Sequence, residues 1–182
     1  AHQTHYEQFG TISGSVDLGA YGVREIEIRG VRDHSYGNLR DWADLHRYCI
    51  QYISLEDGSY VAAGLICMPR TMSRLPMGYV FKPDGSMDPL SSIDFEFHEC
   101  GDDGNSPKEM AFHFVAGGVQ YSVNCHLLEE PIFYMGFDWE ARIHERMCTF
   151  TVNGKRGWGI SEWDYRNHTG RPAIYKKEAP KV

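Results

Sequence analysis

Short runs of alternating apolar and polar residues, separated by tight-turn dipeptides, constrain the fold of this chain most strongly. Apolar side chains fall at every second position in residues 91–99 (SSIDFEFHE) and in residues 117–127 (GGVQYSVNCHL). Successive side chains of a β-strand point to opposite faces, so this period indicates strands with one buried face. The dipeptides Asp57-Gly58, Asp84-Gly85 and Asn153-Gly154 are typical of two-residue hairpin turns. The pattern predicts consecutive antiparallel strands.

Further runs of the same kind bring the expected total to about ten strands. They cover residues 10–17, 23–29, 46–55, 60–67, 76–82, 110–116, 131–137, 141–152 and 156–165. No long segment has the 3.6-residue period of an amphipathic helix, and residues 41–48 (DWADLHRY) can form one helical turn at most. The chain is therefore expected to be all-β, as a barrel or a sandwich.

Length and charge limit the partners that this chain can have. Its 182 residues suit one domain with a sizeable core. The net charge of −7 disfavours nucleic acid, because phosphate contacts require a surplus of Lys and Arg. No apolar run approaches the roughly 18 to 20 residues that span a bilayer, and the first residues do not form a signal peptide. We expect neither a nucleic-acid partner nor a membrane span.

The domain organisation is expected to be simple. We predict one barrel domain over residues 1–168 and an extended C-terminal arm over residues 169–182 (TGRPAIYKKEAPKV), which either wraps a neighbour or stays mobile. The chain starts at Ala1 rather than Met. We expect that it was trimmed, that its first residue was engineered, or that it is one piece of a longer precursor. The sequon at Asn167 (NHT) predicts a glycosylated and therefore extracellular protein.

Cysteine and histidine spacing argues against a metal site. The five cysteines are widely spaced without a C-x-x-C pair, and we expect most of them to be buried free thiols, with one disulfide left open. The nine histidines show neither H-x-H nor H-E-x-x-H spacing. No P-loop and no G-x-S-x-G elbow occurs, which excludes the commonest nucleotide and hydrolase signatures.

Two stretches combine charges with aromatic residues and glycines: residues 30–42 (GVRDHSYGNLRDW) and residues 154–166 (GKRGWGISEWDYR). Such a mixture is typical of a site in which a buried polar group has preset partners. An apolar wall would raise the pKa of a carboxyl group enough for general acid catalysis, and the candidates are Asp33, Glu145 and Glu162, with His34 as an alternative near neutral pH. The competing interpretation is a structural network, and its members are Arg40, Glu145 and Arg166.

The two stretches together resemble a known superfamily. The segment His34-Ser35-Tyr36-Gly37 with Arg40-Asp41-Trp42, followed later by residues 157–162 (GWGISE), is similar to the carotenoid hydratase (hydroxyneurosporene synthase) and AttH-like superfamily. Uncharacterised animal members, some fused to phosphotransferase-like domains, are expected to be nearest. The resemblance covers about Gly19 to Arg166 and implies an antiparallel lipocalin-like β-barrel. Members carry two such barrels, and this chain matches the second.

The resemblance implies a ligand-binding function. The named activities share a long apolar ligand, such as a carotenoid or another isoprenoid or polyene, held in a barrel. We expect this chain to bind such a ligand, without a cofactor for catalysis and together with a second barrel from the same precursor or a homologous subunit. The predicted ligand-binding residues are His34, Tyr36, Trp42, Tyr52, Tyr79, Phe95, Tyr121 and Trp158. Arg40 and Trp42 are expected to be mainly architectural.

Two alternatives remain open at this point. In the first, the chain is a hydratase or cyclase in which Asp33 or Glu162 protonates a double bond and nearby aromatic rings stabilise the carbocation. In the second, it is a scaffolding domain of a larger phosphotransferase-like protein, and side chains pack the barrel solid. A small closed barrel is compatible with either a filled or a hollow interior, and core packing is the simpler explanation for any single aromatic residue.

Overall fold

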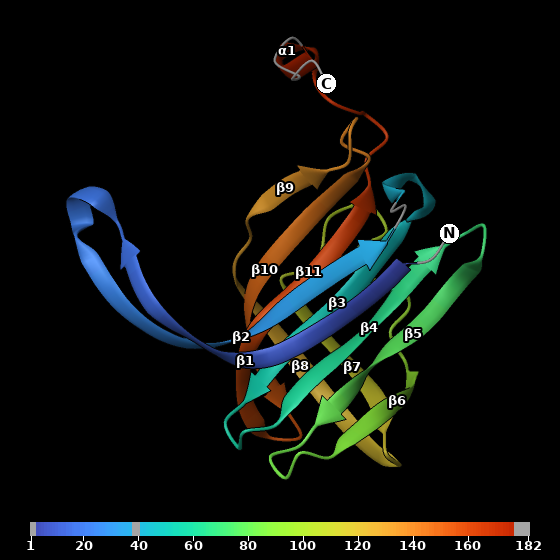
Figure 1. The fold of residues 1–182 in the computed structure, drawn as a ribbon. Helices are drawn as coiled ribbons and strands as arrows, with labels where there is room; N and C mark the ends of the chain where they lie inside the picture. The colour runs from blue at the N-terminus through green and yellow to red at the C-terminus, as the bar shows by residue number, and fades with distance from the viewer. Residues whose placement is uncertain (1–2, 38–40, 177–182) are drawn as a thin grey trace. The chain divides into compact units, whose positions relative to one another are not determined.

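The computed structural model describes residues 3–37 and 41–176, and these fall into two compact units that divide at Arg40. The first unit is a long hairpin, and the second is a β-barrel followed by a short C-terminal segment (Figure 1). Each is described by itself. The prediction of an all-β, lipocalin-like barrel is confirmed.

The hairpin consists of β1 (Gln3–Asp17) and β2 (Val23–Gly37), which pair in antiparallel register along their whole lengths. One turn of 3-10 helix, η1 (Gly19–Tyr21), joins them. The predicted strands at residues 10–17 and 23–29 are thus shorter than the real ones. Residues 30–37 (GVRDHSYG), which no predicted strand included, form the second half of β2.

The barrel is built from eight of the described strands. Their order is β11-β3-β4-β5-β6-β7-β8-β10, and a continuous ladder between β10 and β11 closes the sheet on itself. Full closure removes the unpaired strand edges that would otherwise attract other chains. The bounds are β3 (Arg47–Leu55), β4 (Tyr60–Met68), β5 (Met72–Phe81), β6 (Met87–Ile93), β7 (Glu109–Ala116), β8 (Val119–Glu129), β10 (Ala141–Val152) and β11 (Lys155–Arg166).

Smaller elements complete this unit. β9 (Ile132–Met135) pairs with the first four residues of β10. η2 (Trp42–Asp44) is the single helical turn expected before β3. The Asp41 side chain caps η2 by accepting a hydrogen bond from the Ala43 N–H at 2.8 Å. In the region predicted as a C-terminal arm, α1 (Ala173–Lys176) forms one helical turn.

Every second side chain of the barrel strands points inward and fills the interior, as the alternating sequence pattern indicated. Every second residue of β7 is buried, and Phe112, Phe114 and Val123 are among the interior side chains with 0–3% of their surface exposed. Phe95 meets Trp163 edge-on at 5.6 Å between ring centroids. Burial of such side chains provides most of the stabilising free energy of a domain of this size.

One strand departs from the alternating pattern. All nine residues of β3 are buried, so both of its faces are shielded from water. Its inward residues, such as Ile53, belong to the main core, while the outward residues Tyr48, Ile50 and Tyr52 are 5–6% exposed. The outer face of the barrel is therefore apolar along this strand, unlike the polar outer face of a simple solvated sheet.

Candidate functional site

A hollow of about 400 Å³ lies at the end of the barrel where the turns after β3, β5 and β10 meet. We call it the open end and define its floor by the inward residues Leu55, Val80, Tyr121 and Val152. The Tyr121 ring stacks on the deeper Phe114 ring at 4.7 Å with an angle of 7° between the planes. The floor is therefore apolar and rigidly supported, and its volume is within the range of small-molecule pockets.

Two ion pairs form the rim of the open end. Lys155 Nζ lies 2.6 Å from Asp57 Oδ2, and Lys82 Nζ lies 2.6 Å from Asp88 Oδ2. The hydrogen bond to Asp88 raises the pKa of Lys82, and the hydrogen bond to Asp57 raises the pKa of Lys155. Both ammonium groups are therefore charged at neutral pH. An apolar floor below a rim of paired charges suits an amphiphilic ligand that carries a polar head.

The opposite end of the barrel is closed by stacked cations and aromatic rings. The guanidinium groups of Arg47 and Arg146 lie 5.8 and 5.9 Å from the Trp163 ring, and Arg47 also lies 5.1 Å from the Tyr165 ring. We call these four residues the closed end. Burial raises the pKa of the Tyr165 hydroxyl well above its usual value. Arginines placed over aromatic rings in this way add cation-π attraction to the packing of this end.

Carboxylates neutralise the closed end from its periphery. Glu130 Oε1 lies 3.3 Å from Arg146 Nε and accepts a hydrogen bond from His144 Nδ1 at 2.9 Å. Burial lowers the pKa of His144, and the hydrogen bond to Glu130 only partly offsets that effect. Asp102 pairs with Arg47 at 3.1 Å. Each buried guanidinium therefore has a carboxylate near it, although Arg47 Nε and Arg146 Nη1 have no hydrogen-bond partner among the described residues.

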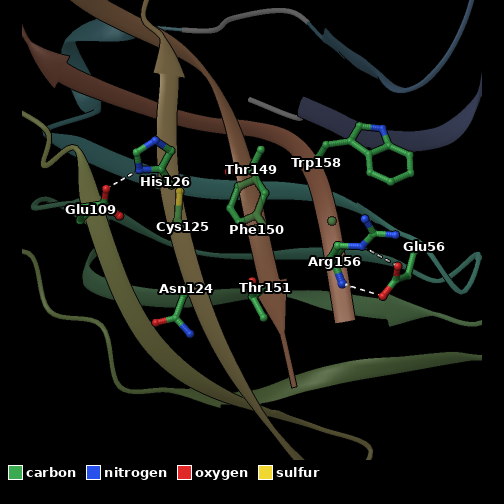
Figure 2. Close-up of a pocket in the computed structure, with 11 residues that line it drawn as sticks. Glu56, Glu109, Asn124, Cys125, His126, Thr149, Phe150, Thr151, Arg156 and Trp158 are labelled. Carbon is green, nitrogen blue, oxygen red and sulfur yellow. Dashed lines mark hydrogen bonds and ion pairs between the residues drawn. The ribbon is translucent and has the colours of Figure 1, made fainter. Parts of the chain in front are cut away.

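A groove of about 480 Å³ lies on the outer face of the barrel, over β8, β10 and β11 (Figure 2). We call it the β10 groove, and Asn124, His126, Thr149, Thr151, Arg156 and Trp158 form most of its lining. At its two margins His126 forms an ion pair with Glu109 and Arg156 with Glu56. All of these residues belong to the barrel unit.

The structure distributes the predicted ligand-binding residues over several places. His34 and Tyr36 are exposed on the hairpin, whereas half-buried Trp42 lies in η2. Tyr52 and Tyr79 alternate with core residues and therefore point away from the barrel interior. Phe95 lies in the core, Tyr121 in the floor of the open end, and Trp158 in the β10 groove. The described residues do not converge on one pocket, and their contact with a ligand stays a prediction.

The hairpin has a small polar and aromatic cluster around His34. Arg32 Nη1 donates a hydrogen bond to the Tyr6 hydroxyl at 2.7 Å, and that hydroxyl shares a hydrogen bond of 3.0 Å with His34 Nδ1. Because the Tyr6 oxygen accepts from Arg32, its own proton is available for His34. Asp33 points to the other face, where its carboxylate lies 3.3 Å from His5 Nε2 and is half exposed. These contacts do not place an apolar side chain beside Asp33.

The other predicted acid, Glu162, is on the outer face of the barrel. It is half-buried and accepts a hydrogen bond from the Tyr48 hydroxyl, and it lies directly opposite Glu145 in the β10–β11 ladder. Directly opposed residues have Cβ atoms about 5 Å apart. The sequence thus named two carboxylates, Glu145 and Glu162, that the fold places side by side, although it assigned Glu145 to a structural network as well.

The remaining predicted residues have structural contacts, except Arg40, which lies outside the described residues. Arg166 Nη1 donates to the Trp42 carbonyl at 3.2 Å, so both residues help to fix η2 against β11. The Asn167 side-chain amide donates to the Trp139 carbonyl at 2.7 Å, and this is the nitrogen that a glycan would occupy. Glycosylation at this position stays a prediction.

The glycines of residues 157–162 (GWGISE) have a packing role. A Cβ on Gly159 would lie 1.9 Å from the Tyr52 carbonyl oxygen, and a Cβ on Gly157 would lie 2.8 Å from the Leu55 side chain. Only glycine allows β11 to approach β3 this closely. This motif therefore fixes the close packing of β11 against β3, and Trp158 and Glu162 are among its outward residues.

Sequence reasoning missed the aliphatic floor and the two rim lysines of the open end. A signal was present: Lys82 and Lys155 lie within two residues of the hairpin dipeptides Asp84-Gly85 and Asn153-Gly154. Turns of alternate hairpins gather at the same end of an antiparallel barrel, so these lysines had to meet there. Among residues 3–37 and 41–176, no group of three or more His, Cys, Asp or Glu side chains is placed to hold a metal ion. All five cysteines are free thiols.

The described helices are short. Within the described ranges, none combines the length and apolar character that crossing a bilayer requires.

Comparison with known proteins gives a family and a fold. The family model described as "Domain of unknown function (DUF7064)" matches residues 1–167. No curated protein matches the sequence. Kievitone hydratase from Nectria haematococca superposes with a TM-score of 0.61 at 12% identity, over 91% of this chain and 53% of that chain. A putative AttH from Nitrosomonas europaea superposes with a TM-score of 0.58 at 14% identity, over 91% and 53%.

The chain therefore spans about half the length of each of these structures. At this low identity the likeness shows the fold alone. The lipocalin-like barrel expected from that resemblance is confirmed, and membership of the AttH-like superfamily stays a prediction. The specific likeness to carotenoid hydratase and to animal members stays a prediction.

Proposed function

This chain belongs to the DUF7064 family, and we propose that it binds a small hydrophobic ligand, of the isoprenoid or polyene class, at the open end of its barrel. The observation that carries the proposal is the hollow of about 400 Å³ with the aliphatic floor Leu55, Val80 and Val152. Covering such a floor with an apolar ligand contributes about 25 cal/mol per Å² of buried surface. A carotenoid would insert only one of its ends, because the interior beneath the floor is packed.

The rim gives the ligand its orientation. A hydroxyl or carbonyl head would lie near Lys82 and Lys155 and accept a hydrogen bond from an ammonium group that is also paired with Asp88 or Asp57. Charge-assisted hydrogen bonds of this kind are stronger than neutral ones. The ligand is therefore expected to be amphiphilic, with its apolar part against Tyr121 and its head outward.

A second lipocalin-like barrel is the proposed partner, from the same precursor or from a homologous subunit. One observation supports it. The chain covers only 53% of each solved structure that it resembles. The partner would cover the part of a long polyene that projects from the open end.

The binding proposal is tested with all-trans-retinol and all-trans-retinoic acid as probes, because both are isoprenoid polyenes with a polar end. Binding is followed by quenching of protein fluorescence. Ser59→Trp introduces a bulky ring at the rim and is expected to abolish binding. Ser73→Trp, at an exposed position near the other end of β5, is the matched control and is expected to bind normally.

Three outcomes would count against this proposal. They are the absence of retinoid binding by the unmodified protein, undiminished binding by Ser59→Trp, and an equal loss in both variants. An organic extract of the purified protein, analysed by mass spectrometry, would then show whether a lipophile accompanies it. A barrel that neither binds the probes nor carries a lipophile would support the scaffolding function.

One observation favours hydratase chemistry as the second candidate function. Glu162 faces Glu145 across the strands, and a pair of neighbouring carboxyl groups is a common arrangement for acid–base catalysis. In a hydration, Glu162 as the acid would give its proton to one alkene carbon, water would add to the other, and Glu145 would take the water proton. Asp33, half exposed beside His5, is the weaker candidate for the acid.

The two candidate functions are separated by conservative substitutions. Under the hydratase hypothesis, Glu162→Gln removes incorporation of ¹⁸O-labelled water into an isoprenoid alkene such as farnesol while ligand binding is retained. Asp33→Asn is the comparison variant and leaves incorporation unchanged. No incorporation by the unmodified protein would reject turnover and leave the binding proposal intact.

A further inference from the structure

The register of the sheet determines the shape of the β10 groove. Across its upper row, Trp158 lies opposite Thr149, and Thr149 lies opposite His126 on the next strand. In the lower row, Thr151 lies between Arg156 and Asn124 in the same way. Short threonine side chains on β10 are thus flanked on both sides by longer ones. The groove follows β10, and its walls stand on β8 and β11 (Figure 2).

The dimensions of the β10 groove suit one sugar ring across its width. Adjacent strands are about 4.8 Å apart, so the backbones of β8 and β11 are roughly 9.6 Å apart. The two rows are about 7 Å apart along the strands, because each residue advances about 3.4 Å. A volume of about 480 Å³ is enough for one or two rings.

The charges that line the groove are paired with one another. Arg156 Nε donates to Glu56 Oε2 at 3.0 Å, and the Arg156 backbone N–H donates to Glu56 Oε1 at 2.9 Å. At the other margin, His126 Nδ1 bonds to a Glu109 oxygen. Neither an anion nor a cation would find an unmatched opposite charge here. The lining therefore favours a neutral ligand.

Hydrogen-bonding groups of both kinds remain along the groove. The Asn124 amide donates and accepts, as do the Thr149 and Thr151 hydroxyls, and all three side chains are exposed. A ligand made only of aromatic carbon would cover these groups without replacing their water, at a cost in free energy for each one. Vicinal hydroxyl groups, which also donate and accept, match this lining.

Trp158 adds an apolar plate to an otherwise polar groove. Its side chain is 43% exposed and lies at the β11 margin of the groove, on the other side of Thr149 from His126. An indole face offers a large, rigid contact area at low cost in side-chain entropy. The C–H face of a pyranose ring is the part of a sugar that can cover such a surface, while the hydroxyls at the ring edge remain available to the polar groups.

From these observations we infer that the β10 groove is a binding site for a neutral carbohydrate, with one pyranose ring against the Trp158 indole and its hydroxyls bonded to Thr149, Asn124 and His126. The site is distinct from the open end of the barrel, and it binds sugar independently of any hydrophobic ligand.

The test uses NMR titration of the whole chain with cellobiose, maltose, lactose and N,N′-diacetylchitobiose. The indole N–H signal of Trp158, assigned with Trp158→Phe, is expected to shift in a saturable way with at least one of these probes. Trp163 is an internal control, because its indole is fully buried and donates to Ser161 Oγ at 3.0 Å. Its signal is expected to stay in place.

Three variants locate the site. Trp158→Ala is expected to weaken binding about tenfold, and His126→Ala about fivefold. Thr149→Phe fills the groove while every other contact residue is kept, and it is expected to abolish binding. Circular dichroism checks that each variant is folded.

Matched controls lie outside the groove. His113→Ala removes another exposed histidine that is paired with a carboxylate, at 2.9 Å from Asp94, and Phe137→Ala removes another exposed aromatic ring. Both are expected to bind as the unmodified protein does. The inference is overturned if no probe shifts the Trp158 signal, if Thr149→Phe binds normally, or if His113→Ala weakens binding as much as His126→Ala.

Discussion

The two ends of the barrel are formed by the same strands, but their side chains pack differently. At the open end, short hairpin turns and aliphatic side chains such as Val80 and Val152 leave a hollow of about 400 Å³. At the closed end, two guanidinium groups lie against Trp163, and its side chain is fully buried. The difference places the axial hollow of the described barrel at the end where the turns are short.

The closed end also uses a different kind of interaction. Cation-π contacts and the carboxylates Glu130 and Asp102 hold Arg146 and Arg47 in place, whereas the open end depends on hydrophobic contact alone below its rim. Buried ion pairs contribute little net stability but cost much when one partner is lost. Substitutions at the closed end should therefore affect folding, and substitutions at the open end should affect binding.

The largest expected effect is that of Trp163→Ala at the closed end. Removing a fully buried indole leaves a cavity and should lower the free energy of unfolding by about 3–5 kcal/mol, measured by urea denaturation. Tyr121→Ala at the open end removes a half-buried ring stacked on Phe114 and should cost only about 1–2 kcal/mol. Equal costs would show that the two ends are packed alike.

Arg146→Met should have the next largest effect. The substitution keeps most of the volume but leaves Glu130 without the guanidinium at 3.3 Å, and we expect a loss of about 2 kcal/mol because Glu130 is partly solvated. Adding Glu130→Gln should recover part of this loss in the double variant. If the double variant is less stable than the sum of the single changes, the ion pair is not the reason.

Acidification should weaken the closed end. Burial lowers the pKa of His144 below 6.5, so below that pH the unfolded chain binds more protons than the native one, and the free energy of unfolding falls. Burial alone would raise the pKa of Glu130, but hydrogen bonds from His144 and Ser106 bring it below 4.5, so its contribution disappears in more acidic solution.

The check is a series of urea titrations between about pH 7 and pH 5. His144→Gln keeps a donor for Glu130 and should flatten the dependence in this window. His98→Gln replaces an exposed histidine, 3.8 Å from Glu99, and should leave the dependence unchanged. A flat profile in the unmodified protein would contradict the role of His144.

The smallest effect on stability is expected at the rim of the open end. Lys82→Met and Lys155→Met remove partly exposed ion pairs, and each should leave the free energy of unfolding nearly unchanged, because solvated ion pairs add little to stability. The two substitutions together should nevertheless remove any preference for retinoic acid over retinol. A preference that survives the double substitution would place the ligand head elsewhere.

Local patterns predicted the barrel well, because alternation and turn dipeptides are encoded within a few residues. The interior position of Phe95 and the single helical turn at Trp42 followed from them. The hairpin was underestimated: its second half pairs with residues about 30 positions earlier, as His34 does with Tyr6, and no local pattern encodes such a partner.

The candidate sites were harder to predict for the same reason. Trp158 and His126 lie on either side of Thr149 because of the register of three strands. In the sequence they are 32 positions apart. Glu162 was identified from its aromatic surroundings, but its position opposite Glu145 depends on the β10–β11 ladder. The rim lysines looked like ordinary turn residues, because their common location appears only once the barrel is closed.

The central claim is that a hydrophobic ligand enters the barrel at the open end. Methyl NMR spectra recorded with and without all-trans-retinoic acid test it most directly. The account predicts that the methyl signals of Leu55, Val80 and Val152 shift on binding, while the indole signal of Trp163 at the closed end does not. A shifted Trp163 signal with unchanged methyl signals at the open end would contradict it.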